Sequence, residues 1–411
     1  MVSGQPFVKF LVVGLNYAPE PTGTGVYTSE LCETLVSAGH HVHVVCAPPY
    51  YPQWSTYIGF QGIRWSRSII QGVSVLRCPI YVPRKVSGPK RILHYCSFVL
   101  SSAVPLIVTA LRFKPDYIIT VAPTLMVAPV ALLAAKLTRS KAVLHVQDFE
   151  VEAGFATGQM HSGGMTARLA MGFGDWVIRA HDLVTSISPA MVRKLIAKRA
   201  PKTGCYELRN WADIGSVVPA EHSNYRELWS ITTSHVAMYS GSIARKQGIE
   251  VLIDTARLLE KRNDLTFIIC GNGPYRAGLE AVAAGLGNVQ FHDLQPKERL
   301  GDLLNLATIH LLPQKRDAAD LVLPSKLTNM LASGRPVVAG AEIGTGLDEE
   351  IEGCGIAVEP ENPEAMAAAI VALMDDPILY RALGKAARKR AETVWSRAPI
   401  IESFLEWLSR V

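Results

Sequence analysis

The sequence lacks the regular cysteine and acidic motifs that mark several common kinds of site. Its seven cysteines are irregularly spaced and include no C-x-x-C pair, which argues against a disulfide framework and against a zinc site. No D-x-D pair occurs, so the chain has no acidic motif of the kind that holds a divalent ion on a diphosphate. We therefore expect no metal and no other cofactor. Free cysteines are typical of the reducing cytoplasm, where we expect the protein to act.

Leader and nucleic-acid signals are also missing. The first six residues show neither a basic n-region nor a small-residue cleavage site, so we expect no secretory signal. Positive residues are scattered and no recognised nucleic-acid module occurs, so we expect no nucleic-acid partner. Residues 1–200 hold 19 Lys and Arg against 9 Asp and Glu, whereas residues 201–411 hold 22 against 27. The basic first half predicts contact with an anionic partner, either a membrane surface or a diphosphate-bearing acceptor.

One apolar segment has the length of a membrane span. Residues 92–111 contain no Asp, Glu, Lys or Arg, and basic residues flank the segment on both sides: Arg84, Lys85, Lys90, Arg91, Arg112 and Lys114. His94, three serines and Pro105 dilute its apolar character. We therefore expect an interfacial or core helix, peripheral on the inner face of the membrane, with a true span as the alternative.

Short β-rich runs alternate with helical stretches along the chain, and the pattern pauses once, at residues 210–229. Strands are predicted at 8–14, 42–46, 73–77, 117–121, 142–146 and 183–187, and after the pause at 235–240, 265–270, 289–291, 309–312 and 336–339. This predicts an α/β protein with two doubly wound, Rossmann-like domains facing a cleft at the carboxyl ends of their strands. We place the domains at residues 1–211 and 212–396.

An anion site is predicted where residues 317–338 join a polar loop to a short helix and a buried strand. Pro324 and Ser325 are good helix-start residues, and Lys326 adds a full positive charge to the N–H groups of the first turn. Gly334 is expected to end this helix, and Pro336 to begin the strand.

A second anion site is predicted at the start of the second domain, between residues 239 and 248. A cation beside a Gly-Ser loop and a helix N-terminus binds phosphate, which makes Lys246 a candidate with Arg245 beside it. Gly271-Asn-Gly273 follows the next strand, although such a sequence also makes an ordinary turn.

In the first domain, glycines and an acid follow predicted strands. Gly23, Thr24 and Gly25 precede a helix, and their glycines let the backbone approach a ligand closely. The third glycine and the acid of a dinucleotide fingerprint are missing, which disfavours a dehydrogenase. Asp148 follows the strand at 142–146, where a carboxylate can accept a proton from an incoming hydroxyl. Weaker candidates nearby are Glu150, Glu152 and His145, and a buried core histidine is an equal alternative for the last.

These segments together resemble, over nearly the full length, the retaining nucleotide-sugar glycosyltransferases of the GT-B superfamily, closest to the colanic acid biosynthesis enzymes assigned as fucosyltransferases. The resemblance is carried by Tyr17-Ala-Pro-Glu20, Ala47-Pro-Pro-Tyr-Tyr-Pro-Gln-Trp54, Arg77-Cys-Pro-Ile-Tyr-Val-Pro83, Val143-Leu-His-Val-Gln-Asp148, Asn210-Trp211, Lys246-Gln-Gly248 and the segment 317–338. The chain departs from the family pattern at three positions, where Gln147 replaces a histidine, Ser242 an arginine and Asn329 a glutamate.

The resemblance implies roles for particular residues. Asp148, Lys246 and Lys326 would be catalytic. The donor would be held by Gly23, Thr24, Gly25, Gly241, Arg245, Gly271, Gly273, Asp317, Asp320, Ser325, Leu327 and Asn329. The acceptor would stack on Tyr50, Tyr51 and Trp54. The last helix, residues 397–411, would return to the first domain, as it does in GT-B enzymes.

The implied activity is transfer of a sugar from a nucleoside diphosphate sugar to a polyprenyl-diphosphate-linked saccharide in exopolysaccharide biosynthesis, at an anionic membrane surface. Fucose from GDP-fucose is one candidate donor, and UDP donors remain open because Asn329 and the ribose contacts suit both bases. A non-hydrolysing sugar-nucleotide epimerase of the same fold is an alternative. A non-catalytic nucleotide-sugar-binding or membrane-scaffold protein is another, because the family histidine and second glutamate are absent.

Overall fold

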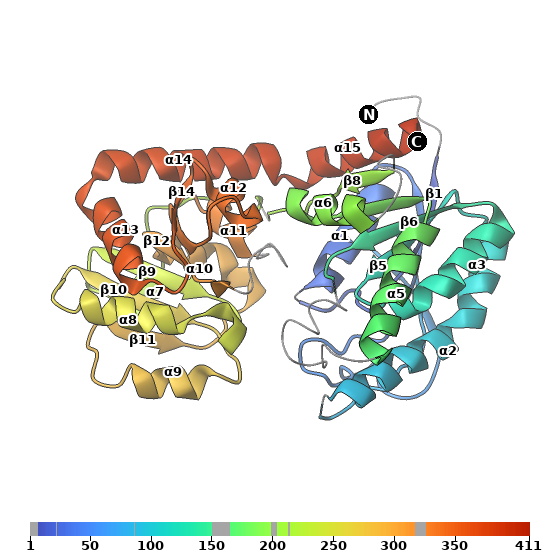
Figure 1. The fold of residues 1–411 in the computed structure, drawn as a ribbon, viewed down its shortest axis with the longest axis horizontal. Coiled ribbons are helices and arrows are strands. Elements are labelled where there is room, and N and C mark those ends of the chain that lie inside the picture. Colours follow the sequence, from blue (N-terminus) through green and yellow to red (C-terminus); the bar gives the residue numbers. More distant parts are fainter. Residues whose placement is uncertain are drawn as a thin grey trace. The chain divides into compact units, whose positions relative to one another are not determined.

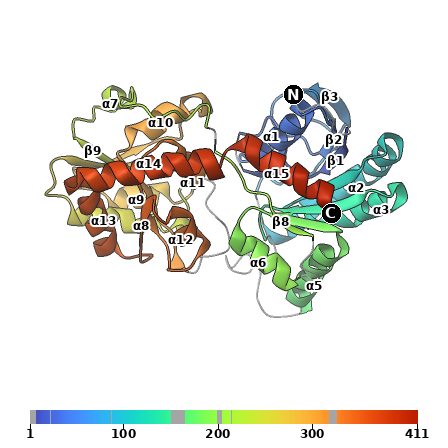
Figure 2. The same cartoon turned by 90° about the horizontal axis from the view of Figure 1, so that it is seen from above.

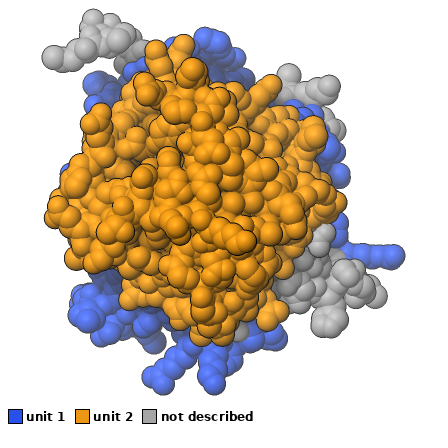
Figure 3. All heavy atoms as spheres, turned by 90° about the vertical axis from the view of Figure 1, so that its left-hand side faces the viewer, with its two compact units in different colours: residues 1–209, 401–411 blue, residues 210–400 orange. Residues whose placement is uncertain are grey.

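The computed structural model describes residues 7–21, 23–85, 87–149, 165–198, 204–212, 214–316 and 326–411. The chain divides into two compact units, residues 1–209 with 401–411 and residues 210–400, which Figure 3 shows in different colours. From the sequence alone, the corresponding boundaries are predicted after residues 211 and 396. Each unit is a parallel α/β sheet with helices, which confirms the predicted class of two Rossmann-like domains.

Unit 1 contains an eight-stranded sheet in the order β3-β4-β2-β1-β5-β6-β7-β8 (Figure 1). Its strands are β1 (Lys9–Val13), β2 (His41–Cys46), β3 (Ser66–Ile70), β4 (Val73–Arg77), β5 (Tyr117–Ala122), β6 (Lys141–Val146), β7 (Leu183–Ser186) and β8 (Cys205–Glu207). Its helices are α1 (Thr24–Ser37), α2 (Gly88–Phe113), η1 (Leu125–Val127), α3 (Ala128–Thr138), α5 (Met165–Ala180), α6 (Pro189–Lys198) and the end of α15 (Arg397–Arg410). Only the edge pair β3–β4 is antiparallel among the strand pairs of this part of the structure.

Helices α2 and α3 lie side by side over one face of this sheet (Figures 1 and 2). Phe98 and Leu106 of α2 are fully buried against Leu11 and Val45 of the central strands, and Ala131 of α3 joins the same cluster. This packing explains the apolar composition of the inner face of α2.

The outer side of α2 remains exposed. The helix is long and apolar enough to cross a membrane by length and composition, and only 22% of its most apolar 18-residue window is buried. The exposed apolar side chains along it are Ile92, Leu93, Leu100, Val104 and Leu111. The helix therefore packs on its own sheet with one side and presents apolar side chains with the other.

The last helix packs against the first sheet. Within α15, the carbonyl of Leu408 accepts a hydrogen bond of 2.9 Å from the Tyr117 hydroxyl of β5. Trp407 stacks on Tyr206 of β8 with ring centroids 4.7 Å apart. The end of the chain thus belongs to unit 1.

Unit 2 contains a six-stranded sheet in the order β11-β10-β9-β12-β13-β14, and each neighbouring pair is parallel. Its strands are β9 (His235–Ser240), β10 (Leu265–Cys270), β11 (Val289–His292), β12 (Ile309–Leu312), β13 (Val337–Gly340) and β14 (Gly355–Val358). Its helices are α7 (Tyr225–Leu228), η2 (Arg245–Gln247), α8 (Glu250–Leu258), α9 (Arg276–Val282), η3 (Lys297–Arg299), α10 (Leu300–Leu306), α11 (Lys326–Ala332), α12 (Gly346–Ile351), α13 (Pro363–Asp375) and α14 (Pro377–Val394).

The long helices of unit 2 begin where the sequence supplies caps. The Asn362 side chain accepts a hydrogen bond from the Ala365 N–H, and Asp376 caps the next helix in the same way. A proline follows each cap at the first helical position, where its missing N–H removes no helical bond. Buried apolar residues on both faces of the sheet then form two clusters, one on each side.

Candidate active site

Two glycine turns of unit 2 meet backbone to backbone at the carboxyl ends of β9 and β10. The Ile243 N–H donates to the Asn272 carbonyl at 3.0 Å, and the Gly241 N–H donates to the Cys270 carbonyl at 2.9 Å. A Cβ at Gly271 would lie 1.8 Å from the Gly241 oxygen, so position 271 admits no side chain. At Gly273 it would lie 2.0 Å from the Ile243 oxygen. Both glycines are required for this close contact between turns.

Lys326 brings a positive charge to these turns. The Nζ atom of Lys326 donates a 2.8 Å hydrogen bond to the Tyr239 hydroxyl, which itself donates to the Ser242 carbonyl at 2.7 Å. Nζ also lies 4.0 Å from the centroid of the Tyr239 ring. A Cβ at Gly241 would lie 3.3 Å from Nζ. Among the residues that the structure describes, no carboxylate forms an ion pair with Lys326. Burial lowers the pKa of Lys326 to about 7, so an anion placed here would restore its charge.

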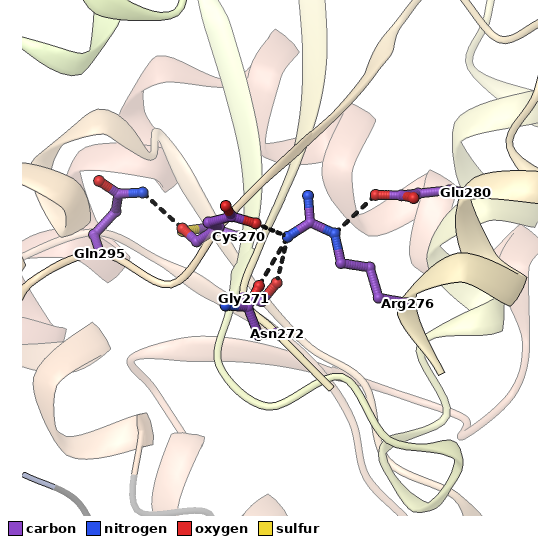
Figure 4. Close-up of polar contacts among 7 residues, drawn as sticks. Cys270, Gly271, Asn272, Arg276, Glu280 and Gln295 are labelled. Atoms are coloured by element: carbon purple, nitrogen blue, oxygen red, sulfur yellow. Dashed lines mark hydrogen bonds and ion pairs between the residues drawn. The ribbon is translucent and has the colours of Figure 1, made fainter. Parts of the chain in front are cut away.

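Arg276 holds the second glycine turn in place, and sequence reasoning did not find it. Its guanidinium donates to the Gly271 carbonyl at 3.0 Å and to the Asn272 side chain at 2.9 Å, and it pairs with Glu280 at 2.7 Å (Figure 4). These bonds raise the pKa of Arg276, with Glu280 as the largest cause. Its place, two residues after the Gly271-Asn-Gly-Pro274 sequence, was the signal that could have found it.

The predicted cations after β9 are described only in part. The Arg245 guanidinium lies 4.9 Å from the centroid of the Tyr275 ring, which orients it beside the second glycine turn. The backbone of Lys246 lies in the short helix η2, and its side chain is outside the described residues.

The loop before α11 also lies outside the described residues, including Asp317, Asp320, Pro324 and Ser325. The helix that follows is present at Lys326–Ala332, and it ends at Gly334 with φ of 68° before strand β13, as predicted. The prediction for Leu327 needs correction: its side chain is fully buried in the core, so only its backbone is available to a ligand. Asn329 lies on the same helix and is half-buried.

In unit 1 a buried carboxylate joins the glycine loop to the aromatic loop. Glu20 accepts hydrogen bonds from the N–H groups of Tyr50 and Tyr51 at 2.9 and 3.0 Å and from the Asn16 amide at 2.8 Å. A Cβ at Gly25 would lie 2.9 Å from the Glu20 carboxylate. Burial raises the pKa of Glu20, although these hydrogen bonds oppose the rise. Sequence reasoning did not single out Glu20, because its partners lie thirty residues away.

The loops are also fixed by a buried arginine. Arg77, at the end of β4, donates to the Ala47 carbonyl at 3.1 Å and also to the Ala18 carbonyl. Its guanidinium lies 5.0 Å from the Phe60 ring centroid. This bond set connects the carboxyl end of β4 to both loops that follow β1 and β2.

The aromatic residues predicted to contact the acceptor differ in exposure. The Tyr50 ring is buried and packs edge-on against Trp54 and His94, with centroids 5.5 and 4.7 Å away. Its predicted stacking role is therefore corrected to packing. Tyr51 remains 38% exposed, and a Cβ at Gly23 would lie 3.6 Å from its ring. The structure thus brings the aromatic loop to the glycine loop at the start of α1.

Asp148 lies half-buried just beyond the carboxyl end of β6. His145, two residues earlier, is buried and contacts Thr185 at 2.8 Å and Gln147 at 2.9 Å. Burial lowers the pKa of His145 to about 4, so the ring is neutral at physiological pH. His145 is the buried core histidine rather than an accessible base. Glu150 and Glu152 are outside the described residues.

Within the described ranges, no group of three or more His, Cys, Asp or Glu side chains could hold a metal ion. The groups described at the candidate site are cations and N–H groups in unit 2 and the carboxylates of Glu20 and Asp148 in unit 1.

Comparison with known proteins points to one family. Residues 22–211 match the model of a glycosyl transferase 4-like domain, and residues 224–390 match glycosyl transferases group 1. The putative colanic acid biosynthesis glycosyl transferase WcaI of Escherichia coli (strain K12) is 40% identical over 410 residues, covering 97% of this chain and 99% of that protein.

Solved structures with similar folds include a sucrose-phosphate synthase from Thermosynechococcus elongatus, with a TM-score of 0.74 and 17% identity over 98% of both chains. Anabaena HepE in complex with UDP-glucose gives a TM-score of 0.71 with 16% identity, covering 98% of this chain and 100% of that chain. These two likenesses concern the fold alone. With both units matched by glycosyltransferase models and a full-length relative at 40% identity, the chain belongs to the GT-B glycosyltransferases.

Proposed function

We propose that this enzyme transfers a sugar, with retention of anomeric configuration, from a nucleoside diphosphate sugar to a polyprenyl-diphosphate-linked saccharide. The full-length relative named for colanic acid biosynthesis supports a place in exopolysaccharide assembly. Fucose from GDP-fucose is the first donor to test. No metal is required in this proposal, because lysines and N–H groups take over the neutralisation of the diphosphate.

The observation that carries the proposal is the setting of Lys326. A half-buried ammonium with one hydroxyl partner, beside two glycine turns at the carboxyl ends of parallel strands, suits a diphosphate. With a pKa of about 7, the amine is only partly protonated near neutral pH when the site is empty, and a bound diphosphate restores its full charge.

In the proposed reaction the bond between the anomeric carbon and the diphosphate oxygen breaks, and the acceptor hydroxyl forms a new bond to the same face of the sugar. The departing oxygen takes the hydroxyl proton. Lys326 and Lys246 stabilise the charge on that oxygen, while Asp148 orients the hydroxyl. Burying the ammonium before the reaction means that little reorganisation is needed when the charge develops.

We further propose that unit 1 associates peripherally with the cytoplasmic face of an anionic membrane. The exposed apolar side of α2 and the basic residues Arg84, Lys85, Lys90 and Arg91 before and at its start support this placement. An apolar stripe beside Lys and Arg is the composition of an interfacial helix.

Donor screening followed by product analysis tests the proposal. A ligand at 100 times its dissociation constant adds about 2.7 kcal/mol of stability, so thermal shift with GDP- and UDP-sugars identifies the donor. The chosen donor is then incubated with a polyprenyl-diphosphate-linked saccharide, and NMR gives the anomeric configuration of the product. Conversion of donor without acceptor would instead favour the epimerase, and an inverted product would refute retention. Donor binding without turnover over a panel of acceptors would favour the non-catalytic alternative.

A further inference from the structure

A cavity lined by none of the predicted donor or acceptor residues lies beneath the end of α2 in unit 1. It measures about 260 Å³ and is lined by residues of β2, β3, β4 and α2: His43, Val44, Arg67, Ser74, Leu76, Val108, Thr109, Arg112 and Phe113. Helix α2 runs from the carboxyl ends of the strands to their amino ends, and about 21 residues separate Arg91 from Arg112. At about 1.5 Å per residue, the cavity lies roughly 30 Å along the helix from the basic segment at its start.

Strand pairing places the basic and hydroxyl groups on one face of the sheet. His43 of β2 is aligned with Ser74 of β4, and Leu76 of β4 is aligned with Arg67 of β3. Side chains two apart on a strand share a face, so these four side chains point to the side that α2 covers. Ile69 shares that face and is 79% exposed, so it forms an apolar rim on the edge strand.

The residues that line the cavity carry positive charge and include no carboxylate. The sequence from 34 to 115 contains nine Lys and Arg and no Asp or Glu, and the whole cavity is drawn from this segment. Among the described residues, neither Arg67 nor Arg112 forms a hydrogen bond or an ion pair. The next acid along the chain, Asp116, accepts a 2.7 Å hydrogen bond from the Lys9 N–H.

An aromatic stack fixes the histidine in the cavity wall. The His43 ring stacks on Phe113 with centroids 4.0 Å apart and an interplanar angle of 10°. Burial lowers the pKa of His43, and Arg67 and His41 lower it further. The positive field of Arg67 is therefore felt inside the cavity, where an anion would relieve it.

We propose that this cavity binds a phosphate monoester or diester, with Arg67 and Arg112 as its cationic contacts and Ser74 and Thr109 as hydroxyl donors. Arginine matches phosphate oxygens in a fork geometry, and the unneutralised pair gives the charge that such a ligand needs. The cavity is slightly smaller than the pockets that bind drug-sized ligands, whose volumes begin at roughly 300 Å³, so it suits a compact headgroup. Exposed Ile69, on the same face of β3 as Arg67, and exposed Leu111, next to Arg112 in the sequence, favour a phosphate that carries an acyl chain.

The ligand chemistry has two sources, a lipid headgroup or free phosphate, and two arms of one experiment separate them. The variant Arg67→Gln/Arg112→Gln removes the cationic contacts. Arg64→Gln/Lys136→Gln is its control, because these residues are exposed, as Arg67 and Arg112 are, but do not line the cavity. Circular dichroism and thermal midpoints of both variants establish that they fold.

The first arm measures binding to phosphatidylcholine vesicles that contain phosphatidic acid, or oleic acid at the same surface charge. For a lipid headgroup, the cavity variant binds phosphatidic acid vesicles about tenfold more weakly than the control does, whereas the two variants bind oleate vesicles equally. If only the general surface charge mattered, the cavity variant and the control would lose binding to both kinds of vesicle by the same factor.

The second arm titrates inorganic phosphate into histidine-labelled full-length protein and follows the His43 ring resonances by NMR, assigned with His43→Gln. Saturable shifts in the wild type and control, but not in the cavity variant, show that phosphate binds. If these shifts occur and the cavity and control variants bind vesicles equally, free phosphate is the source. If the cavity variant matches the control in both arms, the site does not exist. Neither arm uses the sugar donor, so this proposal and the transfer reaction fail independently.

Discussion

The two units hold their glycine loops by different means. In unit 2 the turns at Gly241 and Gly271 touch through backbone atoms, and no side chain is needed to join them. In unit 1 the Glu20 carboxylate joins the glycine loop to the loop of Tyr50 through three hydrogen bonds, with Arg77 bonded to both loops. Unit 2 thus fixes its loops with backbone contacts, beside the site proposed for the diphosphate, whereas unit 1 fixes its loops with side chains that can be replaced by mutation.

The surfaces of the units differ as well. Unit 1 carries the exposed apolar side of α2, with exposed Leu133 and Leu137 on the neighbouring helix α3. Its first 200 residues have an excess of ten positive charges, whereas residues 201–411 have an excess of five negative charges. An anionic bilayer should therefore attract unit 1 more strongly than unit 2. Variants of one unit can serve as controls for variants of the other.

The largest effect is expected on membrane binding. Changing Arg84, Lys85, Lys90 and Arg91 together to serine should weaken binding to anionic vesicles by about three orders of magnitude, since each basic residue near the surface contributes about 1 kcal/mol. Sedimentation with vesicles at low and high salt measures it, and binding should weaken as salt rises.

Four exposed basic residues of unit 2 provide the control: Lys261, Arg381, Lys385 and Lys389. Their replacement by serine should leave vesicle binding almost unchanged if unit 1 alone meets the membrane. Binding of the wild type that survives both high salt and alkaline carbonate would mean that α2 spans the bilayer. Absence of binding at every salt concentration would remove the membrane role.

The next largest effect is expected at Lys326. Lys326→Ala should lower turnover at least a hundredfold, about 3 kcal/mol, because a pre-organised cation on the leaving diphosphate acts mainly in the transition state. Steady-state rates at saturating donor measure this loss, with exposed Lys261→Ala as the control. A folded Lys326→Ala enzyme with near-normal turnover would exclude Lys326 from the mechanism.

The backbone contact in unit 2 is tested by Gly273→Ala. The added methyl group would lie 2.0 Å from the Ile243 oxygen, so the turns must separate, and we expect a loss of about 2 kcal/mol in the free energy of unfolding. Gly287→Ala is the matched change, because nothing lies within 4 Å of its Cβ. Thermal and urea denaturation compare the two variants. Equal stability would show that the turns can separate without cost.

Sequence reasoning located the buried parallel strands better than the edge strands. The bounds predicted for β9, β10 and β12 match the structure, because their residues are almost entirely apolar and buried. β3, β8 and β14, each at an edge of its sheet, were missed, and their residues are largely half-buried or exposed. The edge strand β11 was predicted although it is also half-buried. Burial against sheet faces therefore leaves a more regular signal in composition than pairing at an edge.

The site shows the same division. Gly271 and Gly273 were recognised as a turn, but their contact with the turn after β9 depends on a neighbouring strand, which no local pattern reveals. Glu20 was passed over for a similar reason, since its burial comes from a loop thirty residues away. Leu327 was expected at the ligand because the resemblance implied it, yet its side chain lies in the core.

A smaller effect is expected at Asp148. Asp148→Asn should lower turnover about tenfold while donor affinity stays nearly constant, because the carboxylate acts on the acceptor hydroxyl and not on the diphosphate. Asp182→Asn is the control in unit 1, at the start of β7, where the side chain accepts a hydrogen bond from the Ala142 N–H. An unchanged rate for Asp148→Asn would transfer the role to Glu150 or to the leaving phosphate. A large loss of donor affinity would place Asp148 on the donor.

The last prediction concerns proton exchange at Lys326, which is measured without turnover. Its folded pKa is about 7 against an ordinary 10.5, so between these values the unfolded chain binds more protons than the native protein. The contribution of this group to the free energy of unfolding of the unliganded enzyme should therefore rise with pH between about 7 and about 10.5. The Lys326→Met variant should lack this rise.

Binding of a nucleoside diphosphate sugar at about pH 8 should take up nearly one proton, because the diphosphate favours the charged amine and has no titrating group of its own in this range. Calorimetry in buffers of different ionisation enthalpy measures the uptake. If the wild type binds donor without proton uptake, or if the Lys326→Met variant keeps this uptake, the diphosphate does not lie beside this amine.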